Sequence, residues 1–190
     1  LLRDRVNDDT ALTRFDPATE TLRFIDYKMP AVAGVRPLNA EQRMAFELLQ
    51  DDDVHLVSLV GKAGTGKTLL AIAAGLKMTL EDKRYSRVLV SRPVIPLGKD
   101  IGYLPGAKNE KLSHWMQPFF DNLEYLISVY KRQNMKNADQ LINNKVIELE
   151  ALSYIRGRSL PGQFIIIDEA QNLSPHEIKT IVSRVGEGSK

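Results

Sequence analysis

The feature that most constrains the fold is the sequence Gly-Lys-Ala-Gly-Thr-Gly-Lys-Thr at residues 61–68. It matches the phosphate-binding pattern G-x-x-x-x-G-K-[ST] in full, which chance produces in fewer than about one in a hundred chains of this length. The pattern requires a buried strand before the loop and a helix after it. The apolar run at 54–60 predicts that strand, and the Ala- and Leu-rich segment 68–80 predicts the helix.

The residue types in this loop suit the binding of phosphate groups. Glycines let backbone N–H groups turn toward an anion, and the helix that follows directs its positive end to the same place. Lys67 is expected to reach the β- and γ-phosphates, and Thr68 to offer its hydroxyl to Mg²⁺. The alternative is a Gly-rich turn that binds nothing. The predicted nucleotide-binding residues are Gly61, Lys62, Ala63, Gly64, Thr65, Gly66, Lys67 and Thr68.

A second candidate site feature is the acidic pair that follows the apolar run 164–167. Ligands gather at the carboxyl ends of strands in open α/β sheets, and a phosphate-binding loop needs a carboxylate on a neighbouring strand. We therefore predict that Asp168 lies on the metal side. Glu169 is the candidate general base that orients an attacking water. The alternative is that the two acids merely end a strand and begin a turn.

Strand-like and helical segments alternate along the chain. Short apolar runs at 88–90, 146–149 and 164–167 predict strands, and helices are predicted at 138–143 and 175–185. This alternation is typical of an α/β fold with a mainly parallel sheet flanked by helices. Residues 92–111 are predicted to form a long loop.

The N-terminal part of the chain has a different pattern. Residues 12–25 predict a small β-hairpin, and residues 26–38 read as a linker. Asn39 is placed to cap the helix that follows, with Gln42 three residues further on. The predicted organisation is therefore an N-terminal hairpin and linker, 1–35, followed by one larger domain, 36–190.

Composition excludes several classes of protein. The chain has 190 residues, of which 43% are hydrophobic and 26% charged, as in ordinary globular domains. No apolar run approaches the ~18 residues that span a bilayer, so no membrane association is expected. The chain has no cysteine, which excludes disulfides and thiolate metal sites and fits a cytoplasmic location.

Several motifs carry a family resemblance. Residues 168–171, Asp-Glu-Ala-Gln, resemble the D-E-x-Q box of superfamily 1 helicases, and residues 38–43 resemble their adenine-reading Q motif. More narrowly, the chain resembles the PhoH family of bacterial ATPases, almost continuously from residue 36 to 190. The sequences that carry this likeness are 61–68, 92–94, 102–106, 154–158 and 184–190.

The resemblance implies a RecA-like P-loop NTPase fold and roles for three further residues. Gln42 would read the adenine base, although a purely capping role with Asn39 is the alternative. Gln171 would sense the γ-phosphate, or it is a polar turn residue. Arg158, with Arg156 as a second candidate, would act as an arginine finger toward a neighbouring subunit, or it belongs to a solvated turn.

The resemblance also implies an activity and partners. These are Mg²⁺-dependent ATP hydrolysis coupled to binding or unwinding of single-stranded RNA, a ring of identical subunits predicted to be a hexamer, and an N-terminal PIN ribonuclease domain. Basic and aromatic residues between 92 and 115 suit the binding of single-stranded nucleic acid.

Leu1 in place of Met predicts a fragment, and the family's next strand would follow Lys190, so the ATPase domain is expected to be truncated. The alternative function is a nucleotide-binding assembly switch with little hydrolysis.

Overall fold

A computed structural model describes residues 2–3, 10–26, 28–93, 116–130, 137–155 and 157–190. Within these residues, the centre of the fold is a three-stranded parallel sheet in the order β6–β5–β7. Its strands are Ile147–Leu149 (β6), Val88–Ser91 (β5) and Phe164–Ile167 (β7). These are the short apolar runs that the sequence predicts as strands, and their parallel pairing confirms the α/β class.

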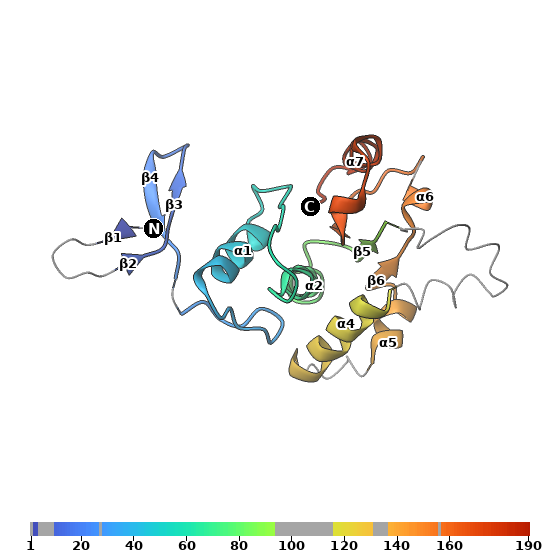
Figure 1. Ribbon diagram of the computed structural model, residues 1–190, viewed down its shortest axis with the longest axis horizontal. Helices are drawn as coiled ribbons and strands as arrows, with labels where there is room; N and C mark the ends of the chain where they lie inside the picture. The colour runs from blue at the N-terminus through green and yellow to red at the C-terminus, as the bar shows by residue number, and fades with distance from the viewer. Residues whose placement is uncertain (1, 4–9, 27, 94–115, 131–136, 156) are drawn as a thin grey trace.

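Helices flank the sheet, and α2 is the helix that carries the end of the candidate loop. It spans Lys67–Leu80 and contacts β5, β7, α1 and α4. Figure 1 shows α1 and α2 side by side between the N-terminal strands and the parallel sheet. The other helices are α1 (Ala40–Gln50), α4 (Gln117–Tyr130), α5 (Ala138–Asn143), α6 (Leu152–Ile155), the short 3-10 helix η1 (Ala170–Asn172) and α7 (Pro175–Val182).

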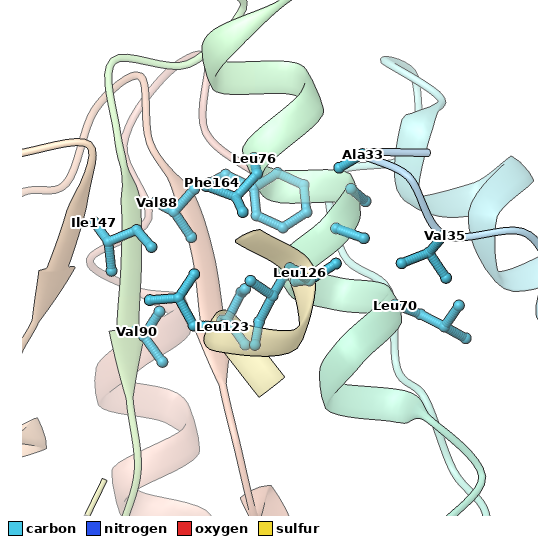
Figure 2. Close-up of a cluster of buried hydrophobic side chains, with 14 of the residues drawn as sticks. Ala33, Val35, Leu70, Leu76, Val88, Val90, Leu123, Leu126, Ile147 and Phe164 are labelled. Carbon is cyan, nitrogen blue, oxygen red and sulfur yellow. The ribbon is translucent and has the colours of Figure 1, made fainter. Parts of the chain in front are cut away.

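The main core lies between the sheet, α2 and α4. Figure 2 shows Val88 and Val90 of β5 and Phe164 of β7 near Leu76 of α2 and Leu123 of α4. All five side chains are buried. Burial of one such side chain stabilises the folded state by about 1.5–3 kcal/mol, so this cluster fixes α2 on the sheet.

The close approach of α2 to β7 depends on the glycine at position 75. A Cβ atom at Gly75 would lie 2.9 Å from a ring carbon of Phe164 and 3.2 Å from a methyl carbon of Val88. Both neighbours are buried and have little room to move. The missing side chain therefore lets α2 pack directly on the sheet, and its first turn lies beside the carboxyl end of β7.

The predicted N-terminal hairpin is confirmed. Strands β3 (Thr13–Asp16) and β4 (Thr21–Phe24) pair in antiparallel fashion, with Phe15 opposite Leu22. A second short antiparallel pair, β1 (Leu2–Arg3) with β2 (Thr10–Ala11), was not predicted. Figure 1 shows both pairs at one end of the molecule.

The prediction of a buried strand at 54–60 is wrong, because the structure has no strand there. Val57 and Leu59 pack against the core, whereas Leu56 is 76% and Val60 93% exposed. Within the described residues, no backbone hydrogen bond joins residues 55–60 to β5, β6 or β7. A strand needs a backbone partner, and an apolar run alone does not supply one.

The predicted helix starts are confirmed in detail. The Asn39 side chain accepts a hydrogen bond from the Gln42 N–H at 2.8 Å, and Ser174 forms a reciprocal capping box with Glu177. Helix α7 ends at Val182, three residues before its predicted end at 185. Most of the loop predicted at 92–111 lies outside the described residues, because the structure describes nothing between 93 and 116.

Candidate nucleotide site

The loop 61–66 connects the unpaired segment 54–60 to the first turn of α2. Gly64 and Gly66 have φ angles of +77° and +83°, in the left-handed region that favours glycine. Gly66 is also the N-cap of α2, and its carbonyl oxygen accepts a hydrogen bond from the Leu70 N–H. Residues 61–65 are exposed. The loop therefore opens to solvent where the positive end of α2 begins, as an anion-binding loop requires.

Lys67 holds the loop in its present form. Its Nζ atom donates hydrogen bonds to the carbonyl oxygens of Gly61 and Lys62, at 2.8 Å each. The Thr65 hydroxyl donates to the same Lys62 oxygen at 2.8 Å. The Lys67 ammonium group thus lies against the loop, where it is available to an anion that enters the loop.

The acidic side of the site begins where β7 ends. The Asp168 N–H donates to the Ser91 carbonyl oxygen at 2.9 Å, which extends the pairing of β7 with β5 by one residue. The Thr68 hydroxyl donates to Asp168 Oδ1 at 2.9 Å. Two residues that are 100 positions apart in the sequence therefore meet, as the two motifs together predict.

The oxygen atoms of Thr68 and Asp168 fit a small divalent cation. Mg²⁺ prefers hydroxyl, carboxylate and water oxygens, and it usually takes only one or two protein ligands beside substrate phosphates. Among the described residues, no group of three or more His, Cys, Asp or Glu side chains has the spacing of a complete metal site. A cation held here would therefore complete its coordination with water and phosphate.

Glu169 is held in a sparsely populated backbone conformation. Its φ and ψ angles are 52° and 37°, and it is the N-cap of η1. This left-handed conformation is uncommon for a residue with a side chain, and Glu20, Ala33, Lys83 and Lys145 also adopt it. The Gln171 side-chain amide donates a hydrogen bond to the Glu169 carboxylate. The structure thus brings Glu169 and Gln171 together beside Asp168.

Arg92 is a site residue that the sequence reasoning missed, because it was assigned to the basic loop. Its guanidinium lies 3.9 Å from Asp168 Oδ2 and 3.7 Å from Glu169 Oε1. The Arg92 side chain is only 20% exposed. A topological signal was available: Arg92 directly follows β5, whose carboxyl end lies next to that of β7.

Gln42 links α1 to the phosphate-binding loop. Its side-chain oxygen accepts a hydrogen bond from the Leu38 N–H at 2.7 Å, and its side-chain nitrogen donates to the Thr65 carbonyl oxygen at 3.2 Å. Its backbone N–H is the group that Asn39 caps. Gln42 therefore lies at the loop, as an adenine-reading residue must, and adenine contact stays a prediction.

Arg158 contacts acidic residues on and just after β6, the edge strand on the opposite side of β5 from β7. It donates a hydrogen bond to Glu150 at 2.7 Å, which raises the pKa of Arg158, and it lies 4.0 Å from Glu148. Burial alone would raise the pKa of Glu148. Hydrogen bonds, of which that from Arg87 is the largest, lower it by more, so the pKa of Glu148 lies below its usual value. No ion pair or hydrogen bond among the described residues joins Arg158 to Asp168 or Glu169. A finger role would therefore be exercised toward another subunit, and it stays a prediction.

The fold and the site together define a class. A Gly-rich loop that opens a helix beside an acid-ended parallel strand is the arrangement of the P-loop NTPase fold, and the chain has this fold. The model of the family described as "PhoH-like protein" matches residues 34–190 of this chain. The chain therefore belongs to the PhoH-like family, whose members are generally ATP-binding P-loop proteins.

Individual relatives agree with this assignment. Protein PhoH2 of Bacillus subtilis (strain 168) is 51% identical over all of this chain, which covers 43% of that protein. Protein PhoH2 of Mycolicibacterium smegmatis is 45% identical over 84% of the chain, which covers 35% of that protein. The chain thus spans less than half the length of these relatives.

None of the helices in the described parts of the chain has the length and apolar character needed to cross a bilayer.

Proposed function

We propose that this chain binds ATP together with Mg²⁺ and that the full-length protein hydrolyses the nucleotide. The observation that carries the proposal is the 2.9 Å hydrogen bond from the Thr68 hydroxyl to Asp168 Oδ1. It joins the two halves of the site, because Thr68 belongs to the phosphate-binding loop and Asp168 to the acid-ended strand. Neither half alone has a full set of groups for triphosphate chemistry.

Binding would use the loop and the start of α2. The phosphates lie in the open loop, where backbone N–H groups and the positive end of α2 face them. The Lys67 ammonium exchanges its two carbonyl partners for phosphate oxygens, which are stronger acceptors because they are charged. Thr68 and Asp168 would hold the cation, which would neutralise charge on the phosphates.

Hydrolysis requires a base near the terminal phosphate, and Glu169 is the candidate. A water oxygen forms a bond to the γ-phosphorus while the bond from that phosphorus to the β–γ bridging oxygen breaks. The Glu169 carboxylate accepts the proton that the water loses, and ADP and inorganic phosphate are the products. Gln171 fixes the carboxylate through its amide hydrogen bond.

The partners belong to the same proposal. Turnover is coupled to single-stranded RNA, and the full-length protein forms a homo-oligomeric ring, with a PIN ribonuclease domain ahead of the hairpin. Support comes from the family resemblance and from the basic and aromatic residues of the segment that follows Arg92. The absence of cysteine supports a cytoplasmic location.

The test is release of inorganic phosphate from ATP by the full-length protein, with and without Mg²⁺ and mixed-sequence single-stranded RNA. We expect hydrolysis that needs Mg²⁺, that RNA accelerates several-fold, and that the Glu169→Gln variant lacks. Tight nucleotide binding with no hydrolysis under any of these conditions would reject the proposal in favour of a nucleotide-binding assembly switch. Hydrolysis that RNA leaves unchanged would reject the coupling to RNA.

A further inference from the structure

We propose that Arg92 contacts the terminal phosphate of the bound nucleotide, so that this chain supplies a phosphate-binding arginine to its own site. The inference deepens the proposed nucleotide function and rests on it. It assigns a role in substrate recognition to a residue that the sequence places with the following basic segment.

The position of Arg92 follows from the pairing of two parallel strands. Ser91 pairs with Ile167, and the Asp168 N–H donates to the Ser91 carbonyl oxygen. The residues that follow each strand, Arg92 and Asp168, are therefore neighbours across the sheet. Ligands bind outside the carboxyl ends of such strands.

Thr68 and Arg92 each lie near a different oxygen of the Asp168 carboxylate. The Thr68 hydroxyl is 2.9 Å from Asp168 Oδ1, and Arg92 Nη1 is 3.9 Å from Asp168 Oδ2. The Asp168 carboxylate therefore lies between the guanidinium of Arg92 and the Thr68 hydroxyl at the start of α2. A phosphate that enters at Thr68 would lie within reach of the Arg92 side chain.

The donors of Arg92 are not used by the two acids. Distances of 3.9 and 3.7 Å are ion-pair distances and exceed the length of a hydrogen bond. Arg92 Nη1 is buried and has no hydrogen-bond partner among the residues that the structure describes. Buried donors nearly always have an acceptor. Thr79 Oγ1 and Arg184 Nε also lack one among the described residues, so it is the place of Arg92 beside Asp168 and Glu169, together with its unused donor, that points to a ligand. Arg is well suited to a phosphate because its planar fork offers paired donors.

A second arginine, at the other end of β5, shows the geometry of a structural ion pair. Arg87 directly precedes β5 and donates a hydrogen bond from Nη1 to the carboxylate of Glu148 on β6. Arg87 thus pairs through a direct hydrogen bond, whereas Arg92 lies between two carboxylates and bonds to neither. The two residues bracket one strand and differ in whether their donors are satisfied, which makes Arg87→Ala a matched control.

The experiment compares two nucleotides on one variant. In the full-length protein with Mg²⁺, we would measure the affinity for ADP and for a non-hydrolysable ATP analogue. Arg92→Ala should weaken the triphosphate analogue by about 10- to 100-fold, the range for a charge-assisted hydrogen bond, and change ADP by less than about twofold. Arg92→Lys should recover part of the loss, and Arg87→Ala should leave the ratio of the two affinities at the wild-type value.

Since both affinities come from the same preparation, their ratio does not depend on the fraction of variant that is folded. An equal loss for both nucleotides, or no loss for either, would overturn the contact with the terminal phosphate. Wild-type protein that binds neither nucleotide would instead overturn the proposed function, and the inference with it. The two failures are therefore distinguishable.

Discussion

The two sides of the candidate site are held in different ways. The phosphate-binding loop is held mainly by hydrogen bonds from its own Lys67 and by one from Gln42 of α1, and it follows a segment that no strand pairs with. The acidic side follows β7, which pairs with β5 over four residues, and the Asp168 N–H extends that pairing. The loop can therefore rearrange around a ligand, whereas the sheet fixes the position of Asp168.

This difference separates two tasks. A loop whose donors are exposed and whose lysine is bonded only to carbonyl oxygens is suited to capturing phosphate. A carboxylate fixed at a strand end is suited to holding a cation and positioning water. Substitutions in the loop should therefore change the affinity for ATP, and substitutions at Glu169 should change the rate of ATP hydrolysis.

The largest effect is expected from Lys67→Ala. It removes the ammonium group that lies against the loop carbonyls, so we expect ATP affinity to fall by at least about a hundredfold, equivalent to two charge-assisted hydrogen bonds. Calorimetric titration of the full-length protein would measure it. Lys77→Ala is the control, because Lys77 lies on the same helix and pairs with Asp82. Unchanged affinity in the Lys67 variant would show that the loop does not bind the phosphates.

The acidic side is tested by Glu169→Gln. An amide cannot accept the proton of the attacking water, so turnover should fall by about 10²- to 10⁴-fold while ATP affinity stays within a few-fold of wild type. Phosphate release and nucleotide titration on one preparation would measure both. The same change at the exposed Glu124 of α4 is the control. If affinity falls as far as it does for Lys67→Ala, the division of tasks is wrong.

A smaller effect is expected at the link between α1 and the loop. Gln42→Ala removes both side-chain hydrogen bonds but keeps the backbone N–H that Asn39 caps. We expect a several-fold weaker affinity for ATP, little change for GTP, and a melting temperature lower by about 2–4 °C. Gln50→Ala, at the other end of α1, is the control. A larger loss of stability with an unchanged ATP-to-GTP ratio would assign Gln42 to structure alone.

Two apolar runs show what the sequence could predict and what it could not. Residues 54–60 and 164–167 both read as buried strands, yet only the second lies in the sheet. The local pattern identifies apolar residues, but their burial and pairing depend on which strand lies alongside, and that is a non-local property. The capped starts of α1 and α7 were predictable because the cap is set within four residues.

The candidate site shows the same division. The loop and the acidic pair were recognisable because each motif is continuous in the sequence, and a P-loop requires a carboxylate nearby. Arg92 was not, because its role depends on the adjacency of β5 and β7, which no local pattern gives. The bond between Gln171 and Glu169 likewise needs the left-handed turn at Glu169, which is unusual for that residue type.

The central claim is that the start of α2 and the end of β7 form one site for Mg²⁺ and ATP. It is tested most directly by titrating ATP, with and without Mg²⁺, into wild-type protein and Asp168→Asn. We predict that Mg²⁺ tightens binding to the wild type by about tenfold or more, and that the variant matches the wild type without Mg²⁺ but loses the gain. A variant that keeps the full Mg²⁺ effect, or a wild type without one, would contradict the claim.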